Sequence, residues 1–217
     1  MHFLITSGPT REYIDPVRFI SNASSGRMGC ALAQAAIAAG HQVTLITTVE
    51  ISDLKSQISN LRTVRVETAA EMFEAVKRQF TKCDCLIMAA AVADYAPAKT
   101  ERAKIKKSKK TLTIRLKPTA DILKWAGERN LKSQISNLKF IAGFALEDRN
   151  IRKNAEKKLK DKNLDMIIAN TPASIGSNNT AVQIKTRAGK WLKLPVADKQ
   201  TIAGRIIRMI GRQELIR

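Results

Sequence analysis

The sequence has no long apolar run, few aromatic side chains and no targeting pattern. No stretch approaches the roughly 18 consecutive apolar residues that span a bilayer, and the N-terminus lacks a basic segment followed by an apolar secretory one. We therefore expect a cytoplasmic protein without a membrane partner. Because aromatic residues make up only 5% of the chain, its core should consist of Ala, Ile, Leu and Val packed between helices and a sheet.

Cysteine and histidine are also sparse. Three cysteines cannot all pair internally, which favours a reduced compartment. Cys83 and Cys85 should face the same side of one strand, but no second cysteine pair accompanies them, and neither His2 nor His41 has ligand spacing to them. No Ser/His/Asp or Cys/His arrangement is present either, so a side-chain nucleophile is not expected and any metal ligands remain unassigned.

A strong excess of positive charge is the clearest property of the composition. The chain has 38 lysines and arginines against 19 acids, a formal net charge of +19. Such an excess implies polyanionic ligands, either nucleic acid or small phosphorylated molecules. A nucleic-acid-binding protein rests on charge alone, because aromatics for base stacking are few and no recognition helix or RNA-binding motif is present.

Strand-like and helix-like segments alternate along the chain. This alternation predicts an α/β fold in which one domain, residues 1–217, contains a doubly wound, mostly parallel Rossmann-like sheet with a basic flap and a C-terminal hairpin. Serine before residue 27 should cap the first helix, and Gly40 should end it. The predicted strands are 2–7, 42–47, 63–67, 85–92, 111–116, 140–145 and 164–169, followed by a hairpin of 181–186 and 190–195. The predicted helices are 27–40, 69–80, 121–129, one with the apolar stripe Ile151, Ala155 and Leu159, and 198–210.

One eight-residue repeat, LKSQISNL, occurs at residues 54–61 and 131–138. Its period does not continue, which excludes a solenoid. Reuse of a similar connection between a helix and a strand is sufficient to explain it.

The loop after the first predicted strand, SGPTREYIDPVRFISNASSGRMG, combines Arg11, Arg18 and Asn22 with a glycine turn into a helix. Backbone N–H groups and the positive end of a helix can bind an anion there, although the glycines could equally serve only to make turns. Seventeen residues separate Gly8 from Gly26, so the nicotinamide fingerprint is missing. An NAD(P)-dependent oxidoreductase is still an alternative, because fold does not fix function.

The segment MAAAVADY ends a predicted strand in small residues and then a carboxylate. Ligands of open α/β sheets bind beyond the carboxyl ends of the strands, where small side chains let a base or ribose approach the backbone. Asp94 could therefore meet a ribose or a cation, or it could cap a turn.

Two groups of lysines are candidates for binding phosphate. Residues 99–117 contain nine lysines or arginines and one acid, and an extended chain would place Lys104 and Lys106 on one side. Lys158 and Lys162 are four residues apart on a predicted helix. Both groups could also be ordinary solvated charge, since Glu156 and Lys160 can form an i,i+4 pair. Electropositive positioning is what phosphoryl or nucleotidyl transfer chiefly requires.

These motifs in this order, GPTREYIDPVRFISNASSGRMG, AAAVADY, KIKK, GFALE and KNLDMIIAN, resemble those of phosphopantothenoylcysteine synthetases of coenzyme A biosynthesis. The resemblance covers residues 3–194. In many bacteria this enzyme is fused behind a flavin-dependent decarboxylase. Met1 lies one residue before the first predicted strand here, so we expect the stand-alone form without the flavin activity.

The resemblance implies a ligase that joins 4′-phosphopantothenate to L-cysteine. The carboxylate would attack the α-phosphate of a nucleotide, releasing pyrophosphate, and the amine of cysteine would then displace the nucleotide from the acyl-nucleotidylate. The AVADY wording resembles the bacterial type, which uses CTP, with Mg²⁺ to neutralise the triphosphate. Family members are homodimers whose basic flap reaches toward the partner, so a homodimer without bound nucleic acid is expected.

The resemblance also assigns residues. Asn22 matches the asparagine that contacts the acyl intermediate, and Lys104 matches a triphosphate contact; both are the expected catalytic residues. The loop before Asp121, KPTADI, is one residue longer than the family's KNPDI. The nucleotide contacts implied are Ala90, Asp94, Lys104, Asp121, Phe144, Lys158 and Lys162, and the acid substrate is expected at Gly8, Asn22, Ser24, Ser25 and Gly26.

Overall fold

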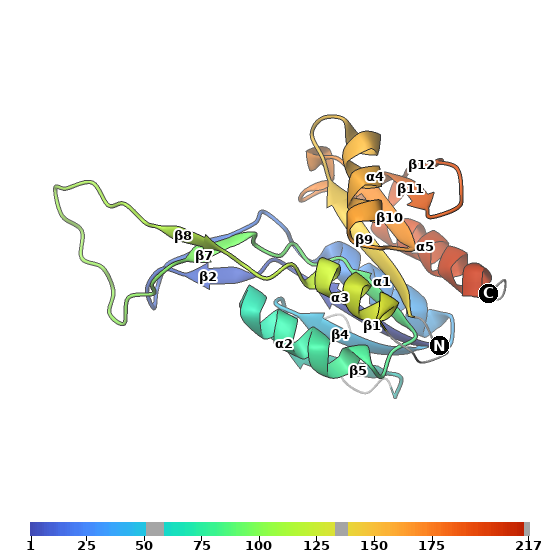
Figure 1. Cartoon of the computed structure of the whole chain (residues 1–217), viewed down its shortest axis with the longest axis horizontal. Helices are drawn as coiled ribbons and strands as arrows, with labels where there is room; N and C mark the ends of the chain where they lie inside the picture. Colours follow the sequence, from blue (N-terminus) through green and yellow to red (C-terminus); the bar gives the residue numbers. More distant parts are fainter. Residues whose placement is uncertain (51–58, 133–138, 215–217) are drawn as a thin grey trace.

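The protein is built around one eight-stranded sheet. The computed structural model describes residues 1–50, 59–132 and 139–214, and Figure 1 shows their arrangement. Six strands run parallel and two antiparallel strands extend one edge, as the sequence predicts for a doubly wound sheet with a C-terminal hairpin. In spatial order the strands are β12 (Leu192–Asp198), β11 (Asn179–Thr186), β10 (Met166–Asn170), β9 (Phe140–Leu146), β6 (Cys85–Met88), β1 (His2–Ser7), β4 (Gln42–Thr47) and β5 (Leu61–Arg65).

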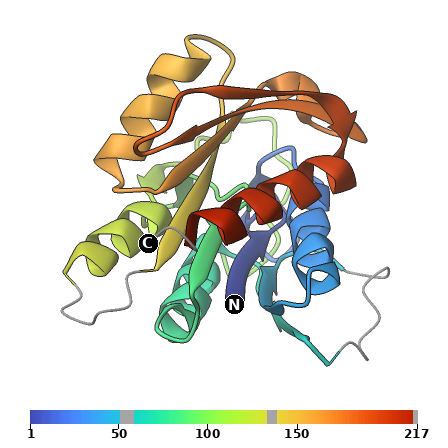
Figure 2. The ribbon, with the colours of Figure 1, turned by 90° about the vertical axis from the view of Figure 1, so that its right-hand side faces the viewer.

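Helices cover both faces of this sheet (Figure 2). One face carries α1 (Arg27–Ala38) and α5 (Lys199–Glu214), and the other carries α2 (Ala69–Phe80), α3 (Ile122–Leu131) and α4 (Ile151–Asp161). Alternate residues of each strand serve the two sides: Phe3 and Ile5 of β1 are buried with α1 and α5, whereas Leu4 is buried with α2. Two apolar layers of mostly aliphatic side chains result.

The first helix begins differently from the prediction. Its N-cap is Gly26 in the left-handed region, with φ 74°, and not a serine; the Ser24 hydroxyl accepts a hydrogen bond from the Gly26 N–H. A residue with a Cβ is strained at that φ, so the chain needs glycine where the loop turns into the helix. Gly40, with φ 80°, follows the end of the helix as expected.

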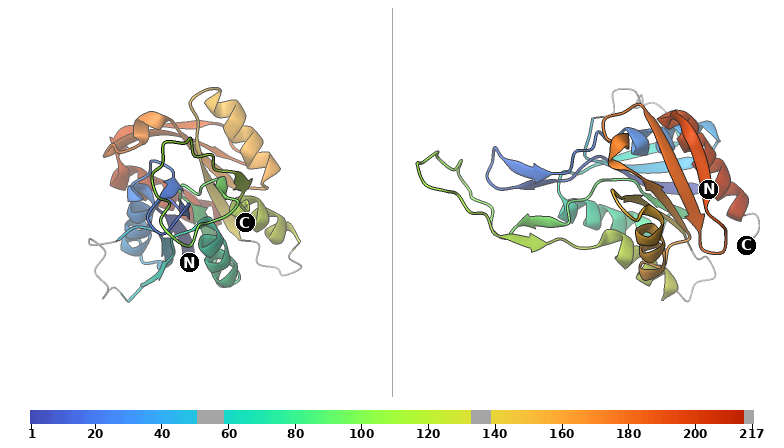
Figure 3. Two further views of the ribbon diagram at one scale, coloured as in Figure 1. Left: turned by 90° about the vertical axis from the view of Figure 1, so that its left-hand side faces the viewer. Right: turned by 90° about the horizontal axis from the view of Figure 1, so that it is seen from above.

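Four short strands form an arm that projects from the body (Figures 1 and 3). The arm consists of two antiparallel pairs, β2 (Arg11–Tyr13) with β3 (Phe19–Ser21) and β7 (Tyr95–Pro97) with β8 (Leu116–Pro118), and of the flap, residues 98–115, between β7 and β8. The segment expected as a plain loop after β1 therefore contains a hairpin. The predicted strand 111–116 is wrong except for Leu116, because this basic segment follows the arm instead of entering the sheet.

Further boundaries also differ. The predicted strand 85–92 stops at Met88. The residues that follow bond to β1 and its loop, since the Ala90 N–H donates to the Thr6 hydroxyl and the Ala91 N–H donates to the Gly8 oxygen. Cys83 precedes β6 and is buried on the α2 face, whereas Cys85 is buried on the α1 face, so the expectation that both share a face is wrong. The LKSQISNL repeat lies largely outside the described residues. Among the helices described, none has the length and apolar character to cross a bilayer.

Candidate functional site

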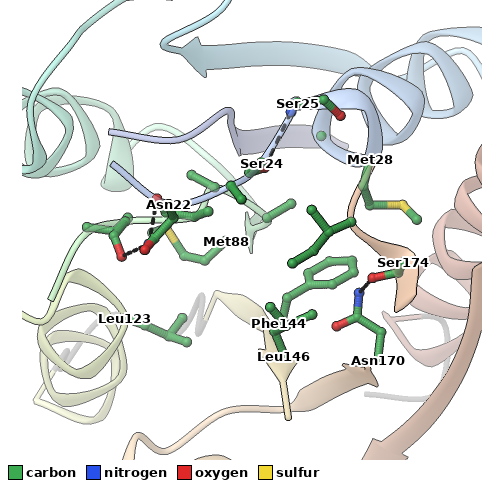
Figure 4. A pocket seen from close by; sticks show the side chains of 18 of the residues that line it. Asn22, Ser24, Ser25, Met28, Met88, Leu123, Phe144, Leu146, Asn170 and Ser174 are labelled. Carbon is green, nitrogen blue, oxygen red and sulfur yellow. Dashed lines mark hydrogen bonds between the residues drawn. The ribbon is translucent and has the colours of Figure 1, made fainter. Parts of the chain in front are cut away.

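A cavity of about 540 Å³ opens beyond the carboxyl ends of the parallel strands (Figure 4). It lies where β1 and β6 are neighbours, the point at which the strand order reverses and ligands of such sheets usually bind. Part of its wall is formed by residues 22–29, which follow β3 and enter α1, and by residues 88–92, which begin at the end of β6. Phe144 of β9 and Ser174 of the 3-10 helix η1 (Pro172–Ser174) also line it. Its charged lining residues are Arg27, Asp94, Asp121, Lys158, Lys162 and Lys199.

Close backbone packing brings the start of α1 to the cavity. A Cβ on Gly29 would lie 2.5 Å from the Ser7 Cβ, and a Cβ on Gly26 would lie 3.2 Å from the Gly8 Cα. Glycine at these positions lets the first turn of α1 rest directly on the end of β1. The helix N-terminus, with its unpaired N–H groups, thus borders the cavity, an arrangement that favours anions.

Asn22 joins the two loops that form this wall. Its Nδ2 donates to the backbone oxygens of Ala91, at 3.3 Å, and Val92, at 3.0 Å. The second loop is also tied to β1, since the Ala90 N–H donates to the Thr6 hydroxyl at 3.1 Å. These bonds engage the amide nitrogen of Asn22 and leave its Oδ1 as the acceptor that a substrate can use.

Two lysines reach the cavity with their ammonium groups already oriented, Lys158 from α4 and Lys162 from the C-cap position that follows it. The Lys158 Nζ donates to the Phe144 oxygen at 2.7 Å, and the Lys162 Nζ lies 2.7 Å from the Asp121 Oδ2. Burial, together with the charge of Lys162, lowers the pKa of Lys158 below its ordinary value. Lys158 is half-buried, and the carboxylates of Asp121, Glu147 and Asp94 offset part of the repulsion from Lys162, so a phosphate in the cavity would add a further counter-charge to this pair.

Two further acids, Asp121 and Glu156, have partners that the sequence did not predict. Burial alone would raise the pKa of Asp121, but hydrogen bonds from the Lys162 side chain and the Lys124 N–H, with the charges of Lys162 and Lys158, lower it overall. Asp121 thus caps α3 and orients Lys162. The expected ordinary pair between Glu156 and Lys160 is not among the described ion pairs; Glu156 instead accepts a hydrogen bond from the Trp191 indole at 2.6 Å.

A second cationic group lines the cavity from the opposite face of the sheet, and sequence reasoning missed it. Arg27 at the start of α1 donates to the Asn178 Oδ1 at 2.6 Å, and the Lys199 Nζ at the start of α5 donates to the Ser174 oxygen at 3.3 Å. Burial and the charge of Arg27 lower the pKa of Lys199. Arg27 lies inside the SSGRMG motif and could have been noticed there, whereas nothing local in the sequence marks Lys199.

Most of the residues predicted for the site line this one cavity. They are Asn22, Ser24, Ser25, Gly26, Ala90, Asp94, Asp121, Phe144, Lys158 and Lys162. Two predicted residues lie elsewhere. Gly8, with φ 84°, packs against Gly26, and Lys104 is exposed in the flap and is not part of the cavity lining.

The carboxylates near the cavity suit a metal that arrives with its ligand better than a protein-bound one. Among the described residues, no group of three His, Cys, Asp or Glu side chains comes together as a metal site. Asp94 and Asp121 are the acids of the lining, and Asp121 already pairs with Lys162. Because Mg²⁺ is commonly held by one or two carboxylates together with substrate phosphates, Asp94 is compatible with such an ion.

These features define a doubly wound α/β protein with an electropositive cavity at its topological switch point, the arrangement that such folds use for phosphorylated small molecules. The model of the DNA/pantothenate metabolism flavoprotein C-terminal domain matches residues 1–213, and the chain belongs to this family. The resemblance seen in the motifs is thereby confirmed at the level of the family.

Curated relatives are similar to this chain over nearly its whole length. The chain is 40% identical to the coenzyme A biosynthesis bifunctional protein CoaBC of Bacillus subtilis (strain 168), over 97% of this chain and 51% of the relative. It is 42% identical to a cysteine/cysteine sulfinic acid decarboxylase from an unknown prokaryotic organism, over 95% of this chain and 56% of the relative. The chain thus spans about half the length of these curated relatives.

A solved structure supports the fold in detail. The crystal structure of the C-terminal domain of a CoaBC protein superposes with a TM-score of 0.80 at 34% identity, covering 100% of this chain and 96% of that domain. The chain therefore corresponds to the C-terminal half of its bifunctional relatives.

Proposed function

We propose that the chain is a phosphopantothenate–cysteine ligase that forms the amide between 4′-phosphopantothenate and L-cysteine at the expense of CTP. The observation that carries the proposal is the convergence of cations from both faces of the sheet on one cavity. Lys158 and Lys162 reach it from the C-terminal end of α4, and Arg27 and Lys199 reach it from the first residues of α1 and α5. A ligase of this type must hold a nucleotide triphosphate and a second phosphorylated molecule side by side.

The chemistry proceeds in two displacements. A carboxylate oxygen of phosphopantothenate attacks the α-phosphorus of CTP, and the bond to pyrophosphate breaks. The amine nitrogen of cysteine then attacks the acyl carbon, CMP leaves, and the nitrogen loses a proton. Both steps need positioning and charge neutralisation more than a side-chain nucleophile, which suits the residues of the cavity.

The residues divide between the two substrates. Small residues around Ala90 let the nucleoside approach the backbone, Asp94 and Phe144 contact it, and Lys158 and Lys162 neutralise its phosphates. The turn of Ser24, Ser25 and Gly26 with the α1 N-terminus receives the acid substrate. The list of proposed nucleotide contacts is Ala90, Asp94, Lys104, Asp121, Phe144, Lys158 and Lys162.

Asn22 is the proposed catalytic residue of amide formation. Because its Nδ2 is bonded to the Ala91 and Val92 oxygens, its Oδ1 has a fixed direction and can accept a hydrogen bond from the amine of cysteine. That bond would orient the nitrogen toward the acyl carbon.

Lys104 requires a different geometry, since it lies in the flap. We propose a homodimer in which the flap of one subunit brings Lys104 to the triphosphate in its partner's cavity. The exposed apolar residues of the arm, Phe19, Tyr95, Leu112 and Leu116, suit contact with a second subunit. The positive charge of the flap then serves a nucleotide, without a nucleic-acid partner.

Mg²⁺ is the proposed cofactor. Bound with CTP, the ion would draw charge from the phosphate oxygens and make pyrophosphate a better leaving group. Asp94 is the carboxylate with which this chain would hold it. The substrates are cytoplasmic metabolites of coenzyme A biosynthesis, and we place the protein in the cytoplasm.

Pyrophosphate release tests reaction, nucleotide and substrate together. Release from CTP or ATP is measured with 4′-phosphopantothenate, with and without cysteine. We expect about one equivalent per site from CTP without cysteine and steady turnover with it. Tight NADPH binding without protection by CTP would favour an oxidoreductase instead, and sequence-selective nanomolar binding of DNA or RNA would favour a nucleic-acid-binding protein.

A further inference from the structure

Asp15 is a buried carboxylate in the turn between β2 and β3. Its side chain is 0% exposed. Oδ1 accepts hydrogen bonds from the backbone N–H groups of Val17 and Arg18, both at 2.8 Å. These two bonds are local and stabilise the turn, but Asp15 also accepts a hydrogen bond from a residue far along the chain.

The distant partner of Asp15 is the basic flap. The Asp15 Oδ2 accepts a hydrogen bond from the Ile105 N–H at 3.1 Å, and the Arg18 guanidinium donates to the Ile105 oxygen at 2.5 Å. The Arg18 Nε also forms an ion pair with the Asp15 Oδ2, at 3.6 Å. Both backbone polar groups of Ile105 are therefore bonded to one charged pair on the opposite hairpin.

This attachment matters because the flap has no regular secondary structure of its own. Its other described bonds to β2 and the turn are those of Thr100 with the Tyr13 oxygen and of the Glu101 N–H with the Ile14 oxygen, both at 2.9 Å. Ile105 is the attachment that lies inside the KIKK segment. A backbone fixed at residue 105 limits the directions that the adjacent Lys104 side chain can take.

We propose that Asp15 is a positioning residue for Lys104: it fixes the flap backbone at Ile105 so that the ammonium group of Lys104 is presented to the triphosphate. This inference rests on the proposed function, in which Lys104 contacts CTP. The charge of Asp15 is satisfied by N–H groups and Arg18, which lower its pKa despite its burial. The carboxylate therefore stays ionised at neutral pH and the bond to Ile105 is a charge-assisted one.

The test is a double-mutant cycle of Asp15→Asn and Lys104→Gln, read as the dissociation constant for CTP. Each single variant should weaken CTP binding roughly tenfold, the scale of one charged hydrogen bond. If Asp15 acts through Lys104, the double variant should also lose roughly tenfold, not a hundredfold. Glu101→Gln is the matched control, because its carboxylate pairs with the exposed Lys99 on the same flap, and it should bind CTP like wild type.

A purely structural role of Asp15 predicts a different outcome. The proposal would be overturned if the double variant lost CTP affinity by the product of the two single losses. It would also be overturned if a folded Asp15→Asn variant had the wild-type dissociation constant for CTP. Should Asp15→Asn fail to fold, Ile105→Pro removes the donor while leaving Asp15 bonded within its turn; CTP binding equal to wild type would then overturn it.

Amide exchange at Ile105 separates this inference from the proposed function. Exchange should accelerate roughly tenfold in Asp15→Asn, whether or not the protein is a ligase. Wild-type protein that fails to bind CTP would defeat the proposed function and the role of Lys104, while faster exchange in Asp15→Asn would still establish the attachment of the flap at Ile105. Unchanged exchange at Ile105 would defeat the attachment itself.

Discussion

Replacing Asn22 by aspartate tests the central step of the proposed reaction. The substitution keeps size but removes the Nδ2 donor, so the bonds to the Ala91 and Val92 oxygens are lost. At about 0.5–1.5 kcal/mol each, two such bonds amount to roughly 1–3 kcal/mol of orientation that the variant lacks. If that orientation is needed only in the transition state of amide formation, the rate should fall by roughly fivefold to 150-fold.

Single-turnover kinetics distinguish this outcome from a general loss of binding. With CTP and phosphopantothenate alone, Asn22→Asp should release pyrophosphate to nearly the wild-type amplitude, whereas consumption of the acyl intermediate after adding cysteine should be slow. Asn179→Asp, at an exposed residue outside the cavity lining, is the control for the added charge. Turnover of Asn22→Asp at the wild-type rate would refute the reasoning.

Three further outcomes follow from the same geometry. CTP affinity should decline as pH rises past the pKa of Lys158, which is lowered from its ordinary value of 10.5, because only the ammonium form attracts the phosphates. In calorimetric titrations the decline should be flatter for Lys158→Gln than for wild type. An equal slope for both proteins would contradict this role of Lys158. Lys199→Gln should weaken binding of 4′-phosphopantothenate and leave CTP binding near wild type, because Lys199 lies beside Arg27 on the side of the cavity where α1 begins; a loss confined to CTP would contradict this division of the cavity. Gly127→Ala should lower the free energy of unfolding measured in urea by about 1–3 kcal/mol, since its Cβ would overlap the Lys162 carbonyl oxygen. Gly204→Ala is the control, because its Cβ would lie 3.8 Å from the Arg208 guanidinium; it should leave the free energy of unfolding unchanged or raise it by up to about 1 kcal/mol.

The order of strands and helices could be predicted because it depends on local patterns. Apolar runs with β-branched residues gave the parallel strands, and the 3.6-residue stripe of Ile151, Ala155 and Leu159 gave α4. The end of β6 could not be predicted, since small apolar residues continue past Met88 and the bond from Ala90 to Thr6 that diverts the chain is a tertiary one. The N-cap of α1 was also mispredicted: it is Gly26 and not a serine, because the backbone at this position has a positive φ, which a general preference for serine at helix N-termini does not take into account.

The candidate site was predictable only where its residues lie in motifs. The loops after β1 and β6 are continuous in sequence, so Asn22 and Asp94 could be proposed together. Lys199 could not, because its proximity arises from the docking of α5 against the same face as α1. The partner of Asp121 was also hidden, since the pair with Lys162 depends on how α3 and α4 pack.

The cavity wall draws on both ends of the chain, with Asn22 near the N-terminus and Lys199 near the C-terminus. Residues as far apart in the sequence as 22 and 199 must therefore both be in place before this wall is complete. A truncation that removes α5 would lose Lys199 from the cavity and, at the same time, the apolar side chains that α5 packs beside α1. Substrate would therefore be expected to stabilise the protein with α5 in place, and to give no comparable stabilisation to a fragment that lacks it.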